Sequence, residues 1–384
     1  MNMRSRAVYL ALIIVICCLL AGCQGANKVE TIIIDDKEDQ QASNDELSLF
    51  EVKTIYPVME GKSDQVYPLG WSNENALITL GAENYKFAST INRVEFPYVS
   101  QTKLWDERNS IFLFNNLIAL SPDGKEAAFP VVENGAFTLK LFSLAGGNSE
   151  LLGEITTDQL KFVRMTWSSN SRFLTYSIVN EADKQVKIGV YDRETRDTKW
   201  YSLAQNGSNS KEFFALHSIH VSNDGESAVI VKYVARQLML EVGQWSGDKF
   251  KSKYEHPISS EGWVEWIHQD QIAFVGPDGN LYAYDLRNAV VSLLLRDIGL
   301  FRLSDDRKFI AFCQDGDSVF AARLYGNNVL NMKQIYQGII PAQMAWSPDN
   351  GKLLLSGSKK YDIAQPMAET QAFKGMQSLV IEFN

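Results

Sequence analysis

The same hairpin pattern occurs twice in this chain, as Leu120-Ser121-Pro122-Asp123-Gly124-Lys125 and as Trp346-Ser347-Pro348-Asp349-Asn350-Gly351-Lys352. In both copies an apolar residue leads into a turn rich in Ser, Pro, Asp, Asn and Gly, and a second apolar run follows at once. Proline presets φ for the first turn position, aspartate hydrogen-bonds its own backbone, and glycine supplies a positive φ. The pattern therefore predicts a tight β-hairpin.

Weaker copies of this hairpin pattern recur along the chain, so one repeating unit builds the fold. They begin at Trp71, Trp167, Val221, Trp266 and Leu303. Successive copies lie 37 to 54 residues apart, a period that suits four short strands, as in the blade of a propeller. We therefore predict an all-β fold over residues 48–384, a β-propeller of seven four-stranded blades.

The strand count leaves one gap in this propeller. After the last hairpin copy only one further strand follows, over residues 378–383, so the last blade lacks its outer strand. The segment Leu47–Tyr56, which carries apolar residues and precedes the first copy, has no other partner. We predict that it completes the last blade and closes the ring, because an open sheet edge would otherwise remain.

The first 22 residues have the features of a signal peptide. Arg4 and Arg6 precede the apolar run 7–20, and small residues lead to Cys23. That run is short for a spanning helix and has the flanks of a secretory signal. Residues 23–47 are polar and acidic, and we predict a flexible tether there.

The stretch Leu20-Ala21-Gly22-Cys23 resembles the bacterial lipobox. The resemblance implies that the chain is cut before Cys23 and that lipid is attached to this cysteine. Two or more acyl chains give stable anchoring without a spanning helix. We therefore expect a lipid-anchored protein on the extracytoplasmic side of the cell membrane or the outer membrane, with the bilayer as one partner.

Charge and cysteine content limit the remaining partners. The chain has a formal net charge of -9, which argues against nucleic acid because that partner requires a basic surface. Of four cysteines, Cys17 and Cys18 leave with the signal and Cys23 takes lipid, so Cys313 has no partner for a disulfide. Its apolar surroundings in the sequence predict a buried core residue.

The hairpin copies resemble the repeats of TolB-like propellers, which are related to the WD-repeat class. The resemblance covers most of residues 67–357 and implies six to eight blades. These repeats often have Trp just before Ser, as at Trp71, Trp167 and Trp346. We expect those side chains to pack between blades rather than to stack on a ligand. The resemblance does not specify a function, because one fold serves many.

The sequence contains no recognisable catalytic or metal-binding set. The G-x-S-x-G elbow of a serine peptidase is absent. His217 and His220 are three residues apart on a predicted strand, a spacing that directs them to opposite faces. Asp305-Asp306 and Asp315-Gly316-Asp317 fit turns better than a calcium loop. We therefore expect no catalytic residue, no metal and no cofactor, and hence a protein that is not an enzyme.

We interpret the chain as a monomeric binding or scaffolding propeller that recognises a protein or an envelope glycan. The segments 88–109 and 361–377 exceed a minimal blade, and as long loops they are candidates for a recognition face. Two alternatives stay open. One is a lyase or hydrolase with its site in the central channel, and the other is a sensory accessory of a neighbouring membrane protein.

Overall fold

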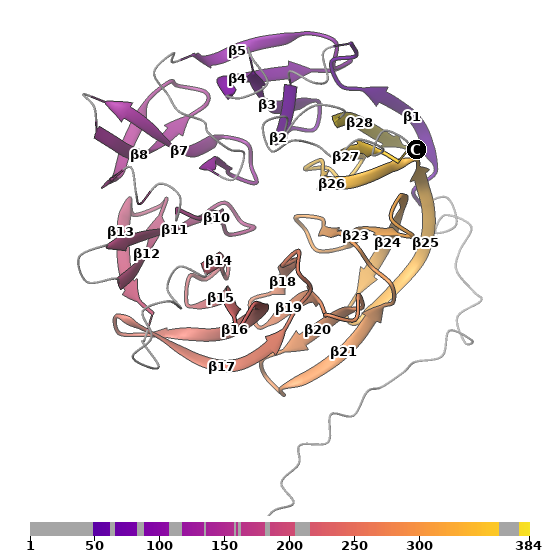
Figure 1. The fold of residues 1–384 in the computed structure, drawn as a ribbon. Coiled ribbons are helices and arrows are strands. Elements are labelled where there is room, and N and C mark those ends of the chain that lie inside the picture. Colours follow the sequence, from indigo (N-terminus) through magenta and orange to yellow (C-terminus); the bar gives the residue numbers. More distant parts are fainter. Residues whose placement is uncertain are drawn as a thin grey trace, which may run out of the picture. The chain divides into compact units, whose positions relative to one another are not determined.

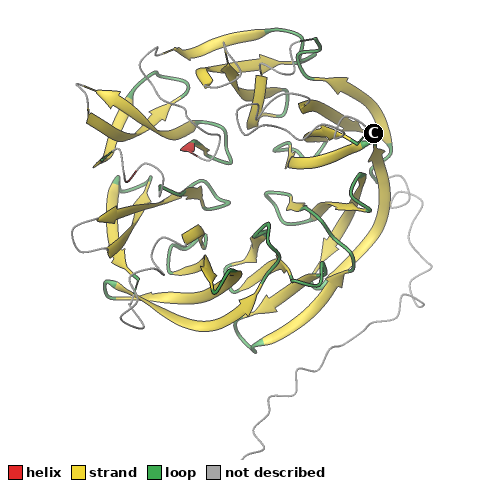
Figure 2. Cartoon of the chain, in the orientation of Figure 1, coloured by secondary structure: helices red, strands yellow, loops and turns green. Residues whose placement is uncertain are grey.

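A computed structural model describes residues 49–61, 66–82, 88–106, 117–133, 136–156, 159, 163–180, 185–203, 216–360 and 376–384. Strands and their connecting turns make up nearly all of these residues (Figure 2). No helix in these ranges is long and apolar enough to cross a lipid bilayer. The predicted signal peptide, tether and lipid-bearing Cys23 all lie outside the described residues.

The strands repeat in groups of four, ordered from the middle of the molecule outwards (Figure 1). The innermost strands are β2 (Val66–Asn73), β6 (Ala119–Leu120), β10 (Met165–Trp167), β14 (Leu216–Val221), β18 (Val264–His268), β22 (Phe301–Leu303) and β26 (Ile339–Trp346). The second strands are β3 (Ala76–Ala82), β7 (Glu126–Glu133), β11 (Phe173–Asn180), β15 (Ser227–Val234), β19 (Gln271–Val275), β23 (Phe309–Gln314) and β27 (Lys352–Lys359).

The outer half of each group has the same arrangement. The third strands are β4 (Ala88–Glu95), β8 (Ala136–Ser143), β12 (Gln185–Asp192), β16 (Gln237–Ser246), β20 (Leu281–Asp285), β24 (Ser318–Tyr325) and β28 (Met376–Phe383). The outermost strands are β5 (Gln101–Asp106), β9 (Ser149–Ile155), β13 (Asp197–Ser202), β17 (Lys249–Pro257), β21 (Val290–Leu295), β25 (Asn328–Gln337) and β1 (Val52–Pro57). Within each group, neighbouring strands are antiparallel, as in the blades of a propeller.

The expected seven four-stranded sheets are not what the described residues form. They form five four-stranded sheets and one eight-stranded sheet. The difference arises because the outermost strands β13 and β17 pair in parallel at Ser202 and Lys249. At this point the Ser202 N–H donates a hydrogen bond to the carbonyl of Asp248 at 2.7 Å. The prediction of an all-β, propeller-like fold is confirmed, and the sheet count is corrected.

The predicted closing strand is present. β1 pairs antiparallel with β28, from Val52 opposite Phe383 to Pro57 opposite Leu379. It thereby becomes the outer strand of the sheet β1-β28-β27-β26, which joins the two ends of the described chain (Figure 1). The hydroxyl of Tyr56 donates to Glu382 at 2.9 Å and adds a side-chain link to the same pair of strands.

The hairpin turns use their recurring polar residues for turn geometry. The Ser121 hydroxyl donates to Asp123 at 2.7 Å, and the Ser347 hydroxyl donates to Asp349 at 2.6 Å. In return, the N–H of Lys352 donates to the Ser347 oxygen at 2.8 Å. These bonds satisfy backbone groups that the tight turn would otherwise leave unpaired.

The tryptophans of the inner strands join neighbouring groups, as the sequence predicted for Trp71, Trp167 and Trp346. Each donates its indole N–H to a backbone carbonyl on the inner strand of the preceding group. The pairs are Trp71 with Ala345 (2.9 Å), Trp167 with Ala119 (3.1 Å), Trp266 with His220 (2.9 Å) and Trp346 with Arg302 (3.2 Å). Because these rings lie mostly buried with their N–H groups bonded, they are packing residues.

The candidate recognition loops have a different outcome. Segment 88–109 is not a long loop, because most of it is the antiparallel pair β4 and β5. Within it Tyr98 is fully buried and Phe96 is half exposed. The segment 361–377 lies outside the described residues except for its last two positions. Cys313 is buried, as predicted, and burial raises the pKa of its thiol to about 11.

Candidate functional site

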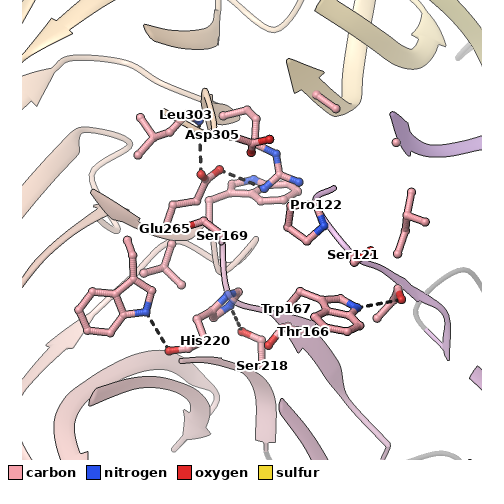
Figure 3. Close-up of a pocket in the computed structure, with 18 of the residues that line it drawn as sticks. Ser121, Pro122, Thr166, Trp167, Ser169, Ser218, His220, Glu265, Leu303 and Asp305 are labelled. Atoms are coloured by element: carbon pink, nitrogen blue, oxygen red, sulfur yellow. Dashed lines mark hydrogen bonds and ion pairs between the residues drawn. The ribbon is translucent and has the colours of Figure 1, made fainter. Parts of the chain in front are cut away.

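The seven inner strands line one cavity in the middle of the ring, with a volume of about 490 Å³ (Figure 3). This volume lies in the range of small-molecule sites, about 300–1,000 Å³. The cavity is therefore the candidate functional site, and its lining follows from the strand alternation.

Every inner strand contributes residues to this cavity, and among them is one at an equivalent position. It is the residue just before the position that packs between groups, and because side chains alternate along a strand it faces the opposite way. The set is Gly70, Ala119, Thr166, His220, Glu265, Arg302 and Ala345, and every member lines the cavity. Gly70, Ala119 and Ala345 are small and come from groups that are neighbours in the closed ring. The other four are polar and also consecutive, so the cavity has one polar wall and one apolar wall, to which Trp71, Leu120 and Trp346 also contribute.

Glu265 organises the polar wall by accepting three hydrogen bonds. The donors are Arg302 Nη1 at 3.1 Å, Arg307 Nη1 at 3.4 Å and the Leu303 N–H at 3.3 Å (Figure 3). Arg302 also donates through Nε to the Met344 carbonyl at 3.2 Å. Glu265 and Arg307 have side chains only 13% exposed, whereas Arg302 is 48% exposed. The first two groups are thus structural, and Arg302 is the member open to the cavity.

Asp305 adds a carboxyl group that faces the cavity beside the arginines (Figure 3). The Asp305 side chain is exposed to the cavity, but the protein atoms around it reduce the solvation of its carboxylate. This desolvation raises the pKa of the carboxyl group. Arg307 and Arg302 act in the opposite direction without cancelling the effect. In the turn, Asp306 rather than Asp305 accepts the hydrogen bond of Ser304 at 2.7 Å. The pair Asp305-Asp306 is therefore divided between the cavity and the turn.

His217 and His220 both line the cavity, which corrects the prediction that they face opposite ways. The reason is a shift of register between β14 and β15 at Leu216 and Ser218. Such a bulge resets the alternation, so residues three apart reach the same side. His220 Nε2 lies 2.9 Å from the Ser218 oxygen, and burial lowers the pKa of its imidazole to about 4. Burial, aided by Arg164, also lowers the pKa of His217. Both rings are neutral at pH 7.

Trp263 is an aromatic lining residue that the repeat pattern does not identify. It lies outside the hairpin signature, just before β18, and it lines the cavity while partly buried. Unlike the four inner-strand tryptophans, it makes no hydrogen bond through its indole N–H within the described part of the chain. Trp263 is therefore available to a ligand.

Opposite charges are nearly balanced around the cavity. Its lining has two arginines, Arg302 and Arg307, and three carboxylates, Glu261, Glu265 and Asp305. Arg164 lies close enough to His217 to affect its pKa, which adds a third positive charge nearby. No group of three or more His, Cys, Asp and Glu side chains in the described ranges has metal-binding geometry.

No known protein-family model and no curated protein matches the chain. Solved structures do match it. The structure of U3-55K is 10% identical, with a TM-score of 0.54, over 85% of this chain and 98% of that chain. A chain of the mitotic checkpoint complex is 10% identical, with a TM-score of 0.52, over 94% and 98%. The β-propeller domain of the Trilobed protease from Pyrococcus furiosus is 14% identical, with a TM-score of 0.47, over 81% and 91%. At these identities the likeness is one of fold alone.

The sequence did contain a signal for the polar wall. In each hairpin copy the residue before the apolar signature position lines the cavity beside the signature residue, and reading it across all copies collects the polar residues Thr166, His220, Glu265 and Arg302. Reading the copies separately missed this set. Asp305 and Arg307 do occupy fixed positions of the hairpin turn, the second and the fourth after the signature residue, and Pro122 and Ser169 line the cavity at the position equivalent to Asp305. Trp263 lies before its hairpin copy and had no such signal.

Proposed function

We propose that this chain is an extracytoplasmic binding protein that is tethered to a membrane through acylated Cys23 and binds its ligand in the central cavity. The observation that carries the ligand site is the convergence of polar side chains from four consecutive groups on one wall, opposite small residues that leave room. A rigid scaffold that places a few polar groups in a concave, partly apolar site is typical of ligand binding. The lipobox resemblance at Leu20–Cys23 supports the anchor.

The proposal includes a seven-bladed ring in which the eight-stranded sheet acts as two blades. A single pair of the backbone ladder joins the sheet of its halves, Ser202 with Lys249, although side chains of both halves also pack in one hydrophobic cluster. By contrast, β15 and β16 within one half share eight pairs, from Ser227 with Gln244 to Val234 with Gln237. Seven blades also account for the seven inner strands around the cavity.

The ligand site is tested by filling the cavity. Ala345→Trp places a large ring in the small-residue wall, and Ala136→Trp is the matched control because Ala136 is exposed on β8, away from the cavity. We expect the soluble hydrolysate of a bacterial envelope to raise the melting temperature of the full-length chain and of Ala136→Trp, but not of Ala345→Trp. Equal stabilisation of all three proteins would show that the ligand binds elsewhere.

An enzyme in the channel is a second candidate, and one observation favours it. Asp305 combines an open position in the cavity with a raised pKa, and such carboxyl groups can act as general acids. Incubation of the chain with the stabilising fraction, followed by chromatography of the products, separates the two functions. Binding alone leaves the fraction unchanged, whereas catalysis consumes it in a manner that Asp305→Asn abolishes.

A further inference from the structure

We propose that the cavity binds an uncharged saccharide unit, an inference that rests on the proposed ligand-binding function and specifies its ligand. Three features carry it: the balance of charge, the set of unbonded donors and acceptors, and the contrast between the two walls.

The charge balance disfavours an ionic ligand. The two guanidinium groups of Arg302 and Arg307 share Glu265, and Asp305 lies near both. Further along the same wall, Arg164 and Glu261 shift the pKa of His217 in opposite directions. A charged ligand placed between these groups would be attracted by the groups of opposite charge and repelled, at similar distances, by the groups of like charge. A ligand without net charge avoids that opposition and still uses the hydrogen-bonding capacity of the same groups.

The unbonded groups include both donors and acceptors. Arg302 uses Nη1 and Nε within the protein, and its Nη2 makes no hydrogen bond among the described residues. The Asp305 carboxyl accepts none there either, and His220 Nδ1 and the Trp263 indole N–H have no partner in the same part of the chain. Each hydroxyl of a sugar can donate one hydrogen bond and accept others. Neighbouring hydroxyls can therefore meet a fixed donor and a fixed acceptor at the same time.

The two walls match the two kinds of surface on a sugar ring. Gly70, Ala119 and Ala345 present little side chain and leave space, and Leu69 and Pro122 add apolar surface beside them. The C–H face of a pyranose can lie against this wall while its hydroxyls point towards the polar wall that carries His220, Glu265 and Arg302. Small-molecule pockets usually combine a mostly apolar lining with a few precisely placed polar groups.

The experiment compares sugars that share one ring and differ in charge. Full-length protein in lauryldimethylamine oxide micelles, a detergent without sugar, is titrated calorimetrically with glucose, glucuronate and glucosamine, and with the matching galactose series and N-acetylglucosamine. We expect at least one neutral sugar to bind with a millimolar or lower Kd, and its acid and its amine to bind about ten-fold more weakly. Asp305→Ala should weaken binding of the neutral sugar about ten-fold, whereas Glu255→Ala, which removes an exposed carboxylate on β17, should leave it unchanged.

Tighter binding of a charged derivative than of its neutral parent would overturn the proposal. The proposal would also be overturned if no sugar bound while the envelope hydrolysate still stabilised the protein. In that case the cavity remains a ligand site for another class of molecule. Failure of the hydrolysate as well would refute the proposed function itself. Unchanged binding by Asp305→Ala would show that the sugar lies outside this cavity.

Discussion

The closing strand β1 depends on one aromatic side chain just before it. Phe50 is 4% exposed, and its ring centroid lies 5.3 Å from that of Phe309, 5.8 Å from Trp346 and 5.5 Å from Phe383. We expect Phe50→Ala to lower the free energy of unfolding by about 3–5 kcal/mol, the usual cost of removing a buried phenylalanine. Phe50 has a positive φ of 64°. Alanine is strained at this φ as well, so the substitution does not offset the lost packing by relieving backbone strain.

Urea denaturation followed by tryptophan fluorescence measures this loss, with Trp346 near the substituted ring as a reporter. The control is Tyr325→Ala, since Tyr325 is 67% exposed and its loss should cost less than about 1 kcal/mol. A cost for Phe50→Ala no larger than that of the control would show that β1 is not part of the cooperative ring. Deletion of residues 47–57 extends the test. This deletion should unfold the domain cooperatively. A truncated protein that melted at the same temperature as the intact protein would refute the role of β1 in closing the ring.

Three further outcomes follow from the inner strands and the anchor. The pKa of His220 is about 4 in the folded chain, against an ordinary value of 6.5. As the pH falls, the unfolded state therefore takes up a proton first, and the free energy of unfolding decreases between these two pH values. The total decrease is about 3 kcal/mol. His220→Phe should remove that part of the acid dependence of urea midpoints, and an unchanged pH profile would contradict it. Trp266→Phe leaves the His220 carbonyl without its 2.9 Å donor and should cost about 1–3 kcal/mol in the same assay, whereas a change below about 0.5 kcal/mol would rule out the bond. Cys23→Ser should abolish incorporation of an alkyne-labelled palmitate in a bacterial host, and labelling that persists would place the lipid elsewhere.

Local turn chemistry explains why most of the fold could be predicted. The Ser-Pro-Asp-Gly hairpins place two strands side by side over a few residues, and their repetition implies radial stacking because one unit cannot bury both of its faces. The missing outer strand after residue 383 followed from counting. The joining of β13 and β17 could not be predicted, because it depends on how closely two outer edges approach in space.

The candidate site was harder to predict for a related reason. Its polar wall is assembled from residues that lie one per repeat, such as Thr166 and Arg302, and each resembles an ordinary strand residue when read alone. The bulge before His220 also reversed the expected direction of His217. A shift of one position in the register turns a side chain to the other face, and sequence alternation cannot show it.

The sequence by itself determined the repeating hairpin, the strand that closes the ring and the tryptophans that join its parts. The hairpin depends on local turn chemistry, the closing strand on a count of strands, and the tryptophans on a position that recurs in the repeat. The tertiary structure alone decided that Glu265, Arg302, Asp305 and His220 share one cavity. Those residues belong to three successive groups, and they meet because the radial arrangement of the groups directs their inner strands to a common axis.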